Sequence, residues 1–167
     1  MKKIILLLIL MSNLSNGQDK EIKITPDGIN HLVISVENKS SMEIYDLAKG
    51  AVLKMFDNPK NNIKVDEAGK LLRFSGFRKF KGSLGSEGIY DYTCELEFRD
   101  NRYKISFYDV FLDKGIKRTY NDLFNKEGEL RKMEFYKTLH SNFTTMINDV
   151  NDLLKNEILK TSSDDKW

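Results

Sequence analysis

Two runs of alternating apolar and polar residues, separated by Asp100 and Asn101, form the clearest pattern in the chain, over residues 90–111. Alternation with a period of two predicts paired β-strands with one buried face. An Asp-Asn loop tolerates the positive φ angles of a two-residue hairpin turn. A shift of one residue would place charged side chains among the apolar ones, so the register is strongly specified. The predicted pairs on the buried face are Phe98 with Tyr103, Leu96 with Ile105, Cys94 with Phe107, and Tyr90 with Phe111.

The opposite face of the same hairpin is predicted to be polar, as is typical of an antiparallel sheet that is covered on one side only. Tyr92 falls opposite Asp109 on the buried face. This pair is the one polar intrusion on that face, and it predicts that the strand end is frayed. The pairs on the polar face are Glu97 with Lys104, Glu95 with Ser106, and Thr93 with Tyr108.

Before the hairpin, the chain predicts a strand and then a helix. Residues 32–36, LVISV, are rich in β-branched side chains and predict a β-strand. Ser40 and Glu43 form a capping box in front of helically spaced apolar residues. This helix is expected to end at Asn58, because the residue before a proline is disfavoured in the α region. Gly50 inside the helix is expected to permit close packing against the sheet.

Further short patterns complete the set of predicted elements. Residues 63–65 and 70–77 predict two more strands, and residues 77–88 predict a long flexible connection or an irregular strand end. Residues 113–128 are polar and turn-like, whereas residues 129–160 carry a sustained helical apolar stripe. The expected arrangement is a helix lying across the sheet; the alternative is a coiled-coil dimer seam. The heptad positions of that seam are Tyr136, Leu139, Phe143, Met146, Val150 and Leu153.

These elements follow the order β-α-β4-α. One apolar sheet face and two amphipathic helices predict an α+β two-layer architecture, in which an antiparallel sheet carries both helices on one face. A lead-in occupies residues 18–30, a single domain residues 31–160, and a polar tail that is expected to be frayed residues 161–167.

The N-terminus predicts export. Residues 1–17 combine two lysines, a short apolar run and small residues before Gln18, the pattern of a cleaved signal peptide. The apolar run is shorter than the roughly 20 residues that span a bilayer, so no transmembrane segment is expected after cleavage. No cysteine follows the run, which argues against a lipoprotein. The expected location is the periplasm or the extracellular space.

The net charge of the chain limits the kinds of partner that are expected. The full chain has 27 basic and 25 acidic residues, and removal of two lysines with residues 1–17 leaves 25 of each. A neutral chain without a dominant basic field is a poor candidate for nucleic-acid binding, which depends on phosphate neutralisation.

The residues that carry chemistry form no catalytic constellation. His31 and His140 are the only histidines, and a histidine metal site needs more ligands at local spacing. The single cysteine, Cys94, lies in the middle of a strand on the buried face, where a small apolar role is expected. No G-x-S-x-G elbow and no phosphate-binding glycine loop are present. The sequence therefore assigns no residue to catalysis, to a cofactor or to a metal, although it does not exclude an enzyme.

Residues 32–114 resemble a bacterial family of exported proteins, the uncharacterised "domain of unknown function with TBP-like fold". The resemblance covers about half of the chain. It implies a TBP-like fold with the same β-α-β4-α order, but no activity, because fold does not carry function. The matching segments are LVISV, SSMEIYDLA, IKVDEAGKLLRFSG and YTCELEFRDNRYKISFYDV.

The preferred function is a small exported module that binds an unidentified protein, peptide or envelope ligand on the polar sheet face. The alternative for this face is a solvated surface held by weak ion pairs. The candidate binding residues are Arg73, Arg102, Lys104 and Tyr108.

Two other functions stay open. One is an envelope enzyme with an acid and a base from its loops, for instance Glu87 or Asp91 beside Arg78. The other is a structural protein that forms a homodimer through the helix over residues 129–160. A compact pocket with two carboxylates of perturbed pKa would favour the enzyme, and a monomer in sedimentation would exclude the dimer.

Overall fold

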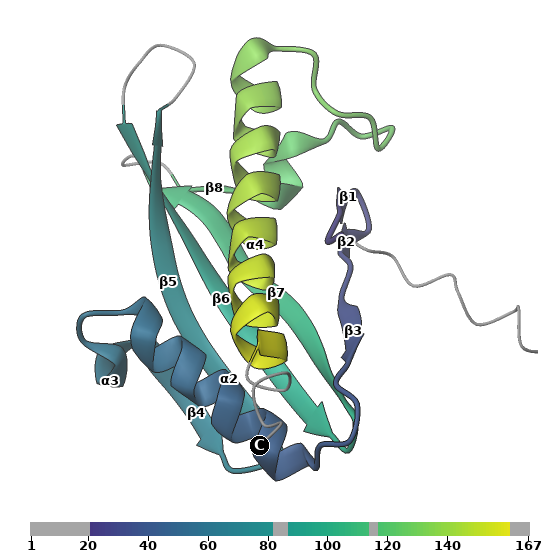
Figure 1. The fold of residues 1–167 in the computed structure, drawn as a ribbon. Coiled ribbons are helices and arrows are strands. Elements are labelled where there is room, and N and C mark those ends of the chain that lie inside the picture. The colour runs from purple at the N-terminus through teal and green to yellow at the C-terminus, as the bar shows by residue number, and fades with distance from the viewer. Residues whose placement is uncertain (1–20, 82–86, 114–116, 161–167) are drawn as a thin grey trace, which may run out of the picture.

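The computed structural model describes residues 21–81, 87–113 and 117–160 (Figure 1). The predicted signal peptide at residues 1–17 and the tail at 161–167 lie outside the described residues. At the centre, strands β6 (Glu87–Arg99) and β7 (Arg102–Asp113) form the predicted hairpin. Asn101 in its turn has a φ of 62°. The predicted register is confirmed from the turn as far as Thr93 opposite Tyr108.

Beyond that pair the predicted register is wrong, because β7 contains a bulge. Asp109 adopts a φ of 48°, a left-handed conformation that aspartate tolerates better than most residues. Asp109 and Val110 together lie opposite Tyr92, so Tyr90 pairs with Leu112 instead of Phe111. The strand is not frayed at this point: the bulge turns Asp109 to solvent and the ladder continues to Asp113.

The hairpin lies in the middle of a six-stranded antiparallel sheet with the order β3-β7-β6-β5-β4, in which β8 also pairs with β7. β5 extends to Lys81, so the first part of the predicted flexible connection is regular strand. Residues 24–29 form a separate two-stranded hairpin of β1 (Ile24–Thr25) and β2 (Gly28–Ile29). The other strands are β3 (Leu32–Ser35), β4 (Ile63–Glu67), β5 (Leu71–Lys81) and β8 (Arg118–Thr119).

Two long helices cover one face of this sheet, as predicted (Figure 1). α2 (Ser41–Met55) begins with the predicted capping box of Ser40 and Glu43. α4 (Glu134–Lys160) begins later than predicted, because the preceding residues are held in extended chain: Leu130 bridges Phe124, and the Arg131 amide donates to the Leu123 carbonyl. Two short helices, α3 (Pro59–Asn62) and η1 (Tyr120–Leu123), connect the larger elements.

The core lies between the helices and the sheet. Its α4 side chains include most of the predicted stripe, and they are buried within this one chain. The helix therefore lies across the sheet, and its apolar face is not available as a coiled-coil seam. None of the described helices is long and apolar enough to cross a membrane. The buried α4 residues are Leu139, Phe143, Met146, Ile147, Val150, Asn151, Leu154 and Ile158.

Gly50 does not have the predicted packing role. A Cβ atom at this position of α2 would meet no atom within 4 Å, so the sheet requires no glycine there. Glycine inside a helix is less favourable than alanine by about 1 kcal/mol. We therefore expect Gly50→Ala to raise the free energy of unfolding by about 0.5–1 kcal/mol, measured by urea denaturation. An unchanged or lower urea midpoint for Gly50→Ala would contradict this expectation. It would show that other atoms occupy the space beside Gly50 in solution.

Candidate functional site

The face of the sheet opposite the helices, called here the open face, carries all four side chains that were predicted to form a binding surface. Arg73 lies on β5, and the other three lie on the outward positions of β7. The structure separates them into two groups. Two are joined in one hydrogen-bond network at the middle of the sheet, and two lie at the end near the hairpin turn. The four residues are Arg73, Arg102, Lys104 and Tyr108.

The network at the middle of the open face is organised by Glu95. The Arg73 guanidinium donates to Oε2 of Glu95 from Nη2 and also from Nε, the latter at 2.7 Å. The Tyr108 hydroxyl donates to Oε1 at 3.2 Å. The two long side chains cover the carboxylate, so Glu95 is only 7% exposed, whereas the sequence predicted a solvated residue. Arg73 and Tyr108 therefore already have partners within the chain.

Lys104 is also neutralised within the chain. It pairs with Glu97, its predicted partner across the hairpin. The hydrogen bond to Glu97 is the main cause of a raised pKa of the Lys104 ammonium. Lys104 is thus a cation with a fixed counter-charge, which reduces its capacity to attract a second anion.

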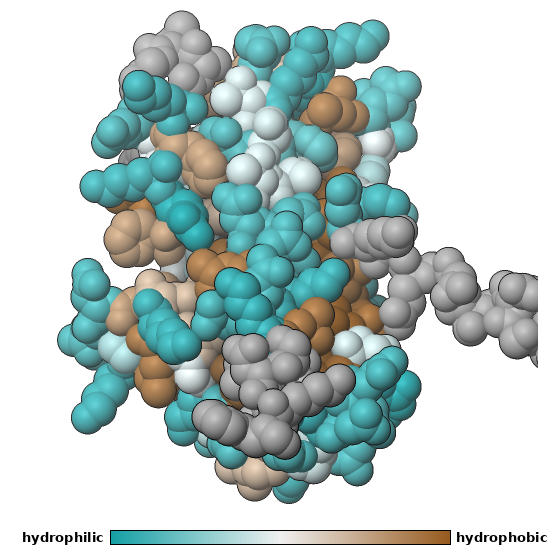
Figure 2. Space-filling view, viewed as in Figure 1, coloured by the Kyte–Doolittle hydropathy of each residue, from teal (hydrophilic) through white to brown (hydrophobic). Residues whose placement is uncertain are grey.

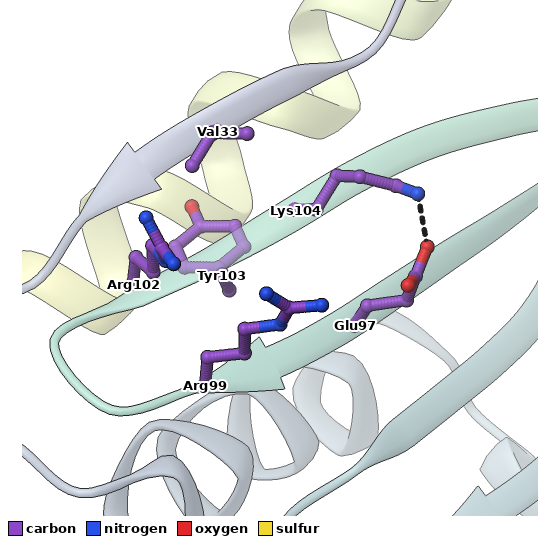
Figure 3. Close-up of a pocket in the computed structure, with 6 residues that line it drawn as sticks. All are labelled: Val33, Glu97, Arg99, Arg102, Tyr103 and Lys104. Atoms are coloured by element: carbon purple, nitrogen blue, oxygen red, sulfur yellow. Dashed lines mark ion pairs between the residues drawn. The ribbon is translucent and has the colours of Figure 1, made fainter.

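Two arginines at the hairpin end differ from these residues. Arg99 and Arg102 lie directly opposite one another at the ends of β6 and β7, and both side chains are exposed. Within the described parts of the chain, neither guanidinium forms an ion pair or a hydrogen bond. Figure 3 shows them extending from the two strands, whereas Lys104 reaches Glu97.

These arginines line a pocket of about 290 Å³, which we call the arginine pocket. Val33 on β3 forms an apolar part of its wall, because it pairs with Lys104 across the strands. The pocket is therefore a shallow site with two free cations beside a small apolar surface. Its lining residues are Val33, Glu97, Arg99, Arg102, Tyr103 and Lys104 (Figure 3).

The hairpin turn next to the arginine pocket is firmly attached to the rest of the fold. Asp100 Oδ1 accepts a hydrogen bond from the Ser41 amide at 2.8 Å, at the start of α2. The Asn101 amide donates to the Lys39 carbonyl, and the Val36 amide donates to the Asn101 carbonyl, each at 2.8 Å. The two arginines are therefore presented by rigid backbone, which lowers the entropy lost when a ligand binds.

The far end of the open face is more apolar than the sequence suggested. Phe77, Asp91 and Phe111 lie in one row across β5, β6 and β7. Phe77 is 57% exposed, and the Lys117 ammonium lies 3.8 Å from the centre of the Phe111 ring. Phe111 was assigned to the core by the predicted register, and the bulge at Asp109 turns it outward.

Asp91 lies between these two aromatic rings. Desolvation raises the pKa of its carboxyl group, with a further contribution from Asp113, whereas Lys117 lowers it. A raised pKa in the fold means that this group stabilises the protein below the pKa of the unfolded chain, near 3.9. The contribution is lost as the pH rises through the higher pKa of the folded state.

We therefore expect Asp91→Asn to increase the free energy of unfolding at pH 7 by about 0.5 kcal/mol and to have no effect near pH 3. Urea denaturation at both pH values measures the difference. Asp149→Asn, on an exposed position of α4, is the matched control and should change neither value. If Asp91→Asn raised the free energy of unfolding as much at pH 3 as at pH 7, the effect would not come from the charge of Asp91.

Neither of the two predicted acids lies opposite Arg78, and Glu87 pairs with Lys81 at the end of β5. Asp91 lies opposite Phe77 on the open face, whereas Arg78 is the next residue along β5 and projects toward the helix side. Within the described residues, no group of three or more His, Cys, Asp or Glu side chains is placed to hold a metal ion. Cys94 is fully buried and burial raises the pKa of its thiol, which disfavours the reactive thiolate.

Two solved bacterial structures share this fold. A TBP-like protein from Parabacteroides distasonis aligns with a TM-score of 0.55 at 17% identity, covering 77% of this chain and 92% of that one. A DUF4468 family protein from Bacteroides ovatus aligns with a TM-score of 0.56 at 13% identity, covering 86% and 94%. The TBP-like fold implied by the sequence resemblance is confirmed. At these identities the similarity concerns the fold alone.

Comparisons of the sequence itself add no assignment of function. A family model described as eukaryotic translation initiation factor eIF2A matches residues 11–111. The matched stretch starts inside the predicted signal peptide, ends within β7 and omits α4, so it does not correspond to a structural unit of this chain. We therefore draw no function from this match. A search of curated proteins finds no match.

Proposed function

We propose that the protein is an exported binding module that holds an anionic group of a protein, peptide or envelope ligand in the arginine pocket. The observation that carries this proposal is the contrast within the open face. Arg73 and Lys104 are each neutralised by a glutamate, whereas Arg99 and Arg102 have no counter-charge among the described residues.

The chemistry of this pair favours a carboxylate or another oxyanion. Two like charges directly opposite one another on paired strands repel, and their repulsion is relieved when an anion binds between them. A guanidinium presents planar, forked donors that match an oxyanion with two parallel hydrogen bonds. Val33 adds an apolar surface for the part of the ligand next to its charged group.

Other features of the chain define the class of partner. The predicted signal peptide supports a partner outside the cytoplasm. The mature chain has equal numbers of acidic and basic residues, and the open face carries carboxylates beside the arginines. Both features disfavour a long polyanion such as a nucleic acid. The proposed partner is therefore a local anionic group on a protein, peptide or envelope component.

In-cell photocrosslinking tests this function. Ser35 is exposed on β3 opposite Arg102, so a photoreactive amino acid at position 35 lies beside the arginine pocket without replacing either arginine. We expect this variant to form a discrete adduct in native cells. The adduct should decrease at least tenfold when Arg99→Glu and Arg102→Glu are added.

Two controls make this result specific. Lys155→Glu reverses an exposed charge on α4, on the other side of the sheet, and should leave the adduct unchanged. A photoreactive residue at position 155 should not give the same adduct. An adduct that persists in the Arg99→Glu/Arg102→Glu background would exclude the arginine pocket as the binding site.

A further inference from the structure

One edge of the sheet, away from the arginine pocket, carries an unpaired length of strand. β4 pairs with β5 only from Leu71 to Phe74, whereas β5 continues to Lys81. Within the described residues, no strand lies on the outer side of the second half of β5. Figure 1 shows this half of β5 as the edge of the sheet above α2. We call residues 75–81 the free edge.

The direction of the main-chain groups on the free edge follows from one hydrogen bond. The Ser75 carbonyl accepts from Nδ2 of Asn62 at 2.8 Å, so the main chain of Ser75 faces outward, away from β6. Because main-chain groups alternate along a strand, the amides and carbonyls of Phe77 and Lys79 also face outward. In the described part of the chain, no group hydrogen-bonds to them.

A pocket of about 440 Å³ opens beside the free edge on the helix side. Its walls come from the end of α2, the following loop, β5 and α4, and they include Phe56, Arg78 and Leu153. Tyr92 also lines the pocket, and its ring lies over Gly76, where a Cβ atom would be 2.5 Å from the tyrosine hydroxyl oxygen. Figure 2 shows apolar surface among polar side chains along this edge.

The charge of the free edge indicates the chemistry of a partner. Arg78, Lys79 and Lys81 are exposed, and none of them forms an ion pair with another described residue. Lysines on an edge strand disfavour pairing with a second copy of the same strand. That protective role does not account for a pocket at the edge or for the exposed ring of Phe77, and both favour a foreign segment.

We propose that the free edge binds an extended peptide segment with alternating apolar and acidic residues, which adds to the sheet beside β5. Its main chain would pair with Phe77 and Lys79, and one apolar side chain would enter the pocket beside Tyr92. Its acidic side chains would lie on the opposite face, beside Lys79 and Lys81. Main-chain pairing supplies affinity in this type of recognition, and the pocket supplies specificity. The inference does not depend on the arginine pocket, which lies at the other end of the sheet.

A proline at position 79 tests the contribution of main-chain pairing to binding separately from the contribution of charge. The Lys79 amide has no acceptor among residues 21–81, 87–113 and 117–160, so Lys79→Pro removes a donor that these residues do not use. Proline is also tolerated on edge strands. Lys79→Ala is the matched control, because it removes the same charge and keeps the amide. The probe is a capped octapeptide of alternating glutamate and valine, compared with a version in which lysine replaces glutamate.

We expect the amides of Phe77 and Lys79 to exchange with solvent at least tenfold more slowly when the glutamate peptide is bound, as measured by NMR. Lys79→Ala should weaken binding a few-fold and Lys79→Pro at least tenfold, whereas the lysine peptide should not bind. Arg99→Glu/Arg102→Glu should bind the peptide as the unmodified chain does, which distinguishes this site from the arginine pocket.

Several results would overturn the proposal. These are unchanged exchange at Phe77 and Lys79 with saturating peptide, equal binding by Lys79→Pro and Lys79→Ala, or a dimer in sedimentation that Lys79→Pro abolishes. The last result would make a second copy of the chain the occupant. If Lys79→Pro does not fold, amide exchange in the unmodified protein still decides the question.

Discussion

Gly76→Ala is expected to destabilise the protein by about 2–3 kcal/mol, although alanine is normally preferred to glycine in a strand. A Cβ atom on Gly76 would lie 2.5 Å from Oη and 2.6 Å from Cζ of Tyr92, and 3.1 Å from Phe56. The Tyr92 ring cannot move aside easily, since it packs edge-on against Phe74 with 6.3 Å between ring centres and also contacts Phe107. Thermal and urea denaturation measure the loss.

The same substitution in a Tyr92→Leu background is the control. Without the ring above position 76, the additional loss caused by alanine should fall below about 1 kcal/mol, because the two changes share one contact. Equal losses in both backgrounds would show that the ring does not restrict position 76. Gly50→Ala provides a second comparison, since its expected effect has the opposite sign.

Phe143→Ala is expected to lower the free energy of unfolding by about 3–5 kcal/mol, the usual range for a fully buried phenylalanine. Phe143 has 0% exposure and attaches α4 to the sheet. Its ring lies edge-on to Tyr90, with 5.6 Å between centres, and Tyr90 in turn contacts Phe80 at 5.3 Å. Alanine would leave a cavity at the α4 end of this aromatic series.

Phe135→Ala is the matched control on the same helix. Phe135 lies in the first turn of α4 and is 38% exposed, so its removal should change stability by less than about 1 kcal/mol. Similar losses at the two positions would mean that α4 is not fixed to the sheet through Phe143.

The sequence predicts the fold well where patterns are local. The Asp100-Asn101 turn and strict alternation determine the hairpin register near the turn, and the capping box determines where α2 begins. The bulge at Asp109 could not be predicted, because Val110, Phe111 and Leu112 are three consecutive apolar residues that indicate no preferred face. A single left-handed aspartate then decides which of them is buried.

The candidate site is predictable only in part, for a similar reason. Alternation places Arg73, Arg102, Lys104 and Tyr108 on the open face. The partners of Arg73 depend on the register between β5 and β6, and the long flexible connection predicted over residues 77–88 left this register unspecified. The one available signal for the arginine pocket was the predicted two-residue turn of Asp100 and Asn101, which implies that Arg99 and Arg102 face one another.

The free edge could not be predicted from the sequence, for a different reason. Residues 77–88 contain several basic residues and glycines, a composition that predicts a flexible connection. The structure shows regular strand as far as Lys81, because residues 75–81 pair fully with β6 on their inner side. Only the difference in length between β4 and β5 exposes the outer side, and strand lengths are not determined by sequence pattern alone.

Arginine side-chain NMR tests most directly whether the open face has a binding site for anions at Arg99 and Arg102. The Nε–H signals of the full chain would be followed while citrate, a small tricarboxylate, is added. We expect the signals of Arg99 and Arg102 to shift in a saturable manner, and the signal of Arg73 to stay in place because its Nε–H already donates to Glu95. Equal, non-saturating shifts of all arginines, or a selective shift of Arg73, would contradict the account.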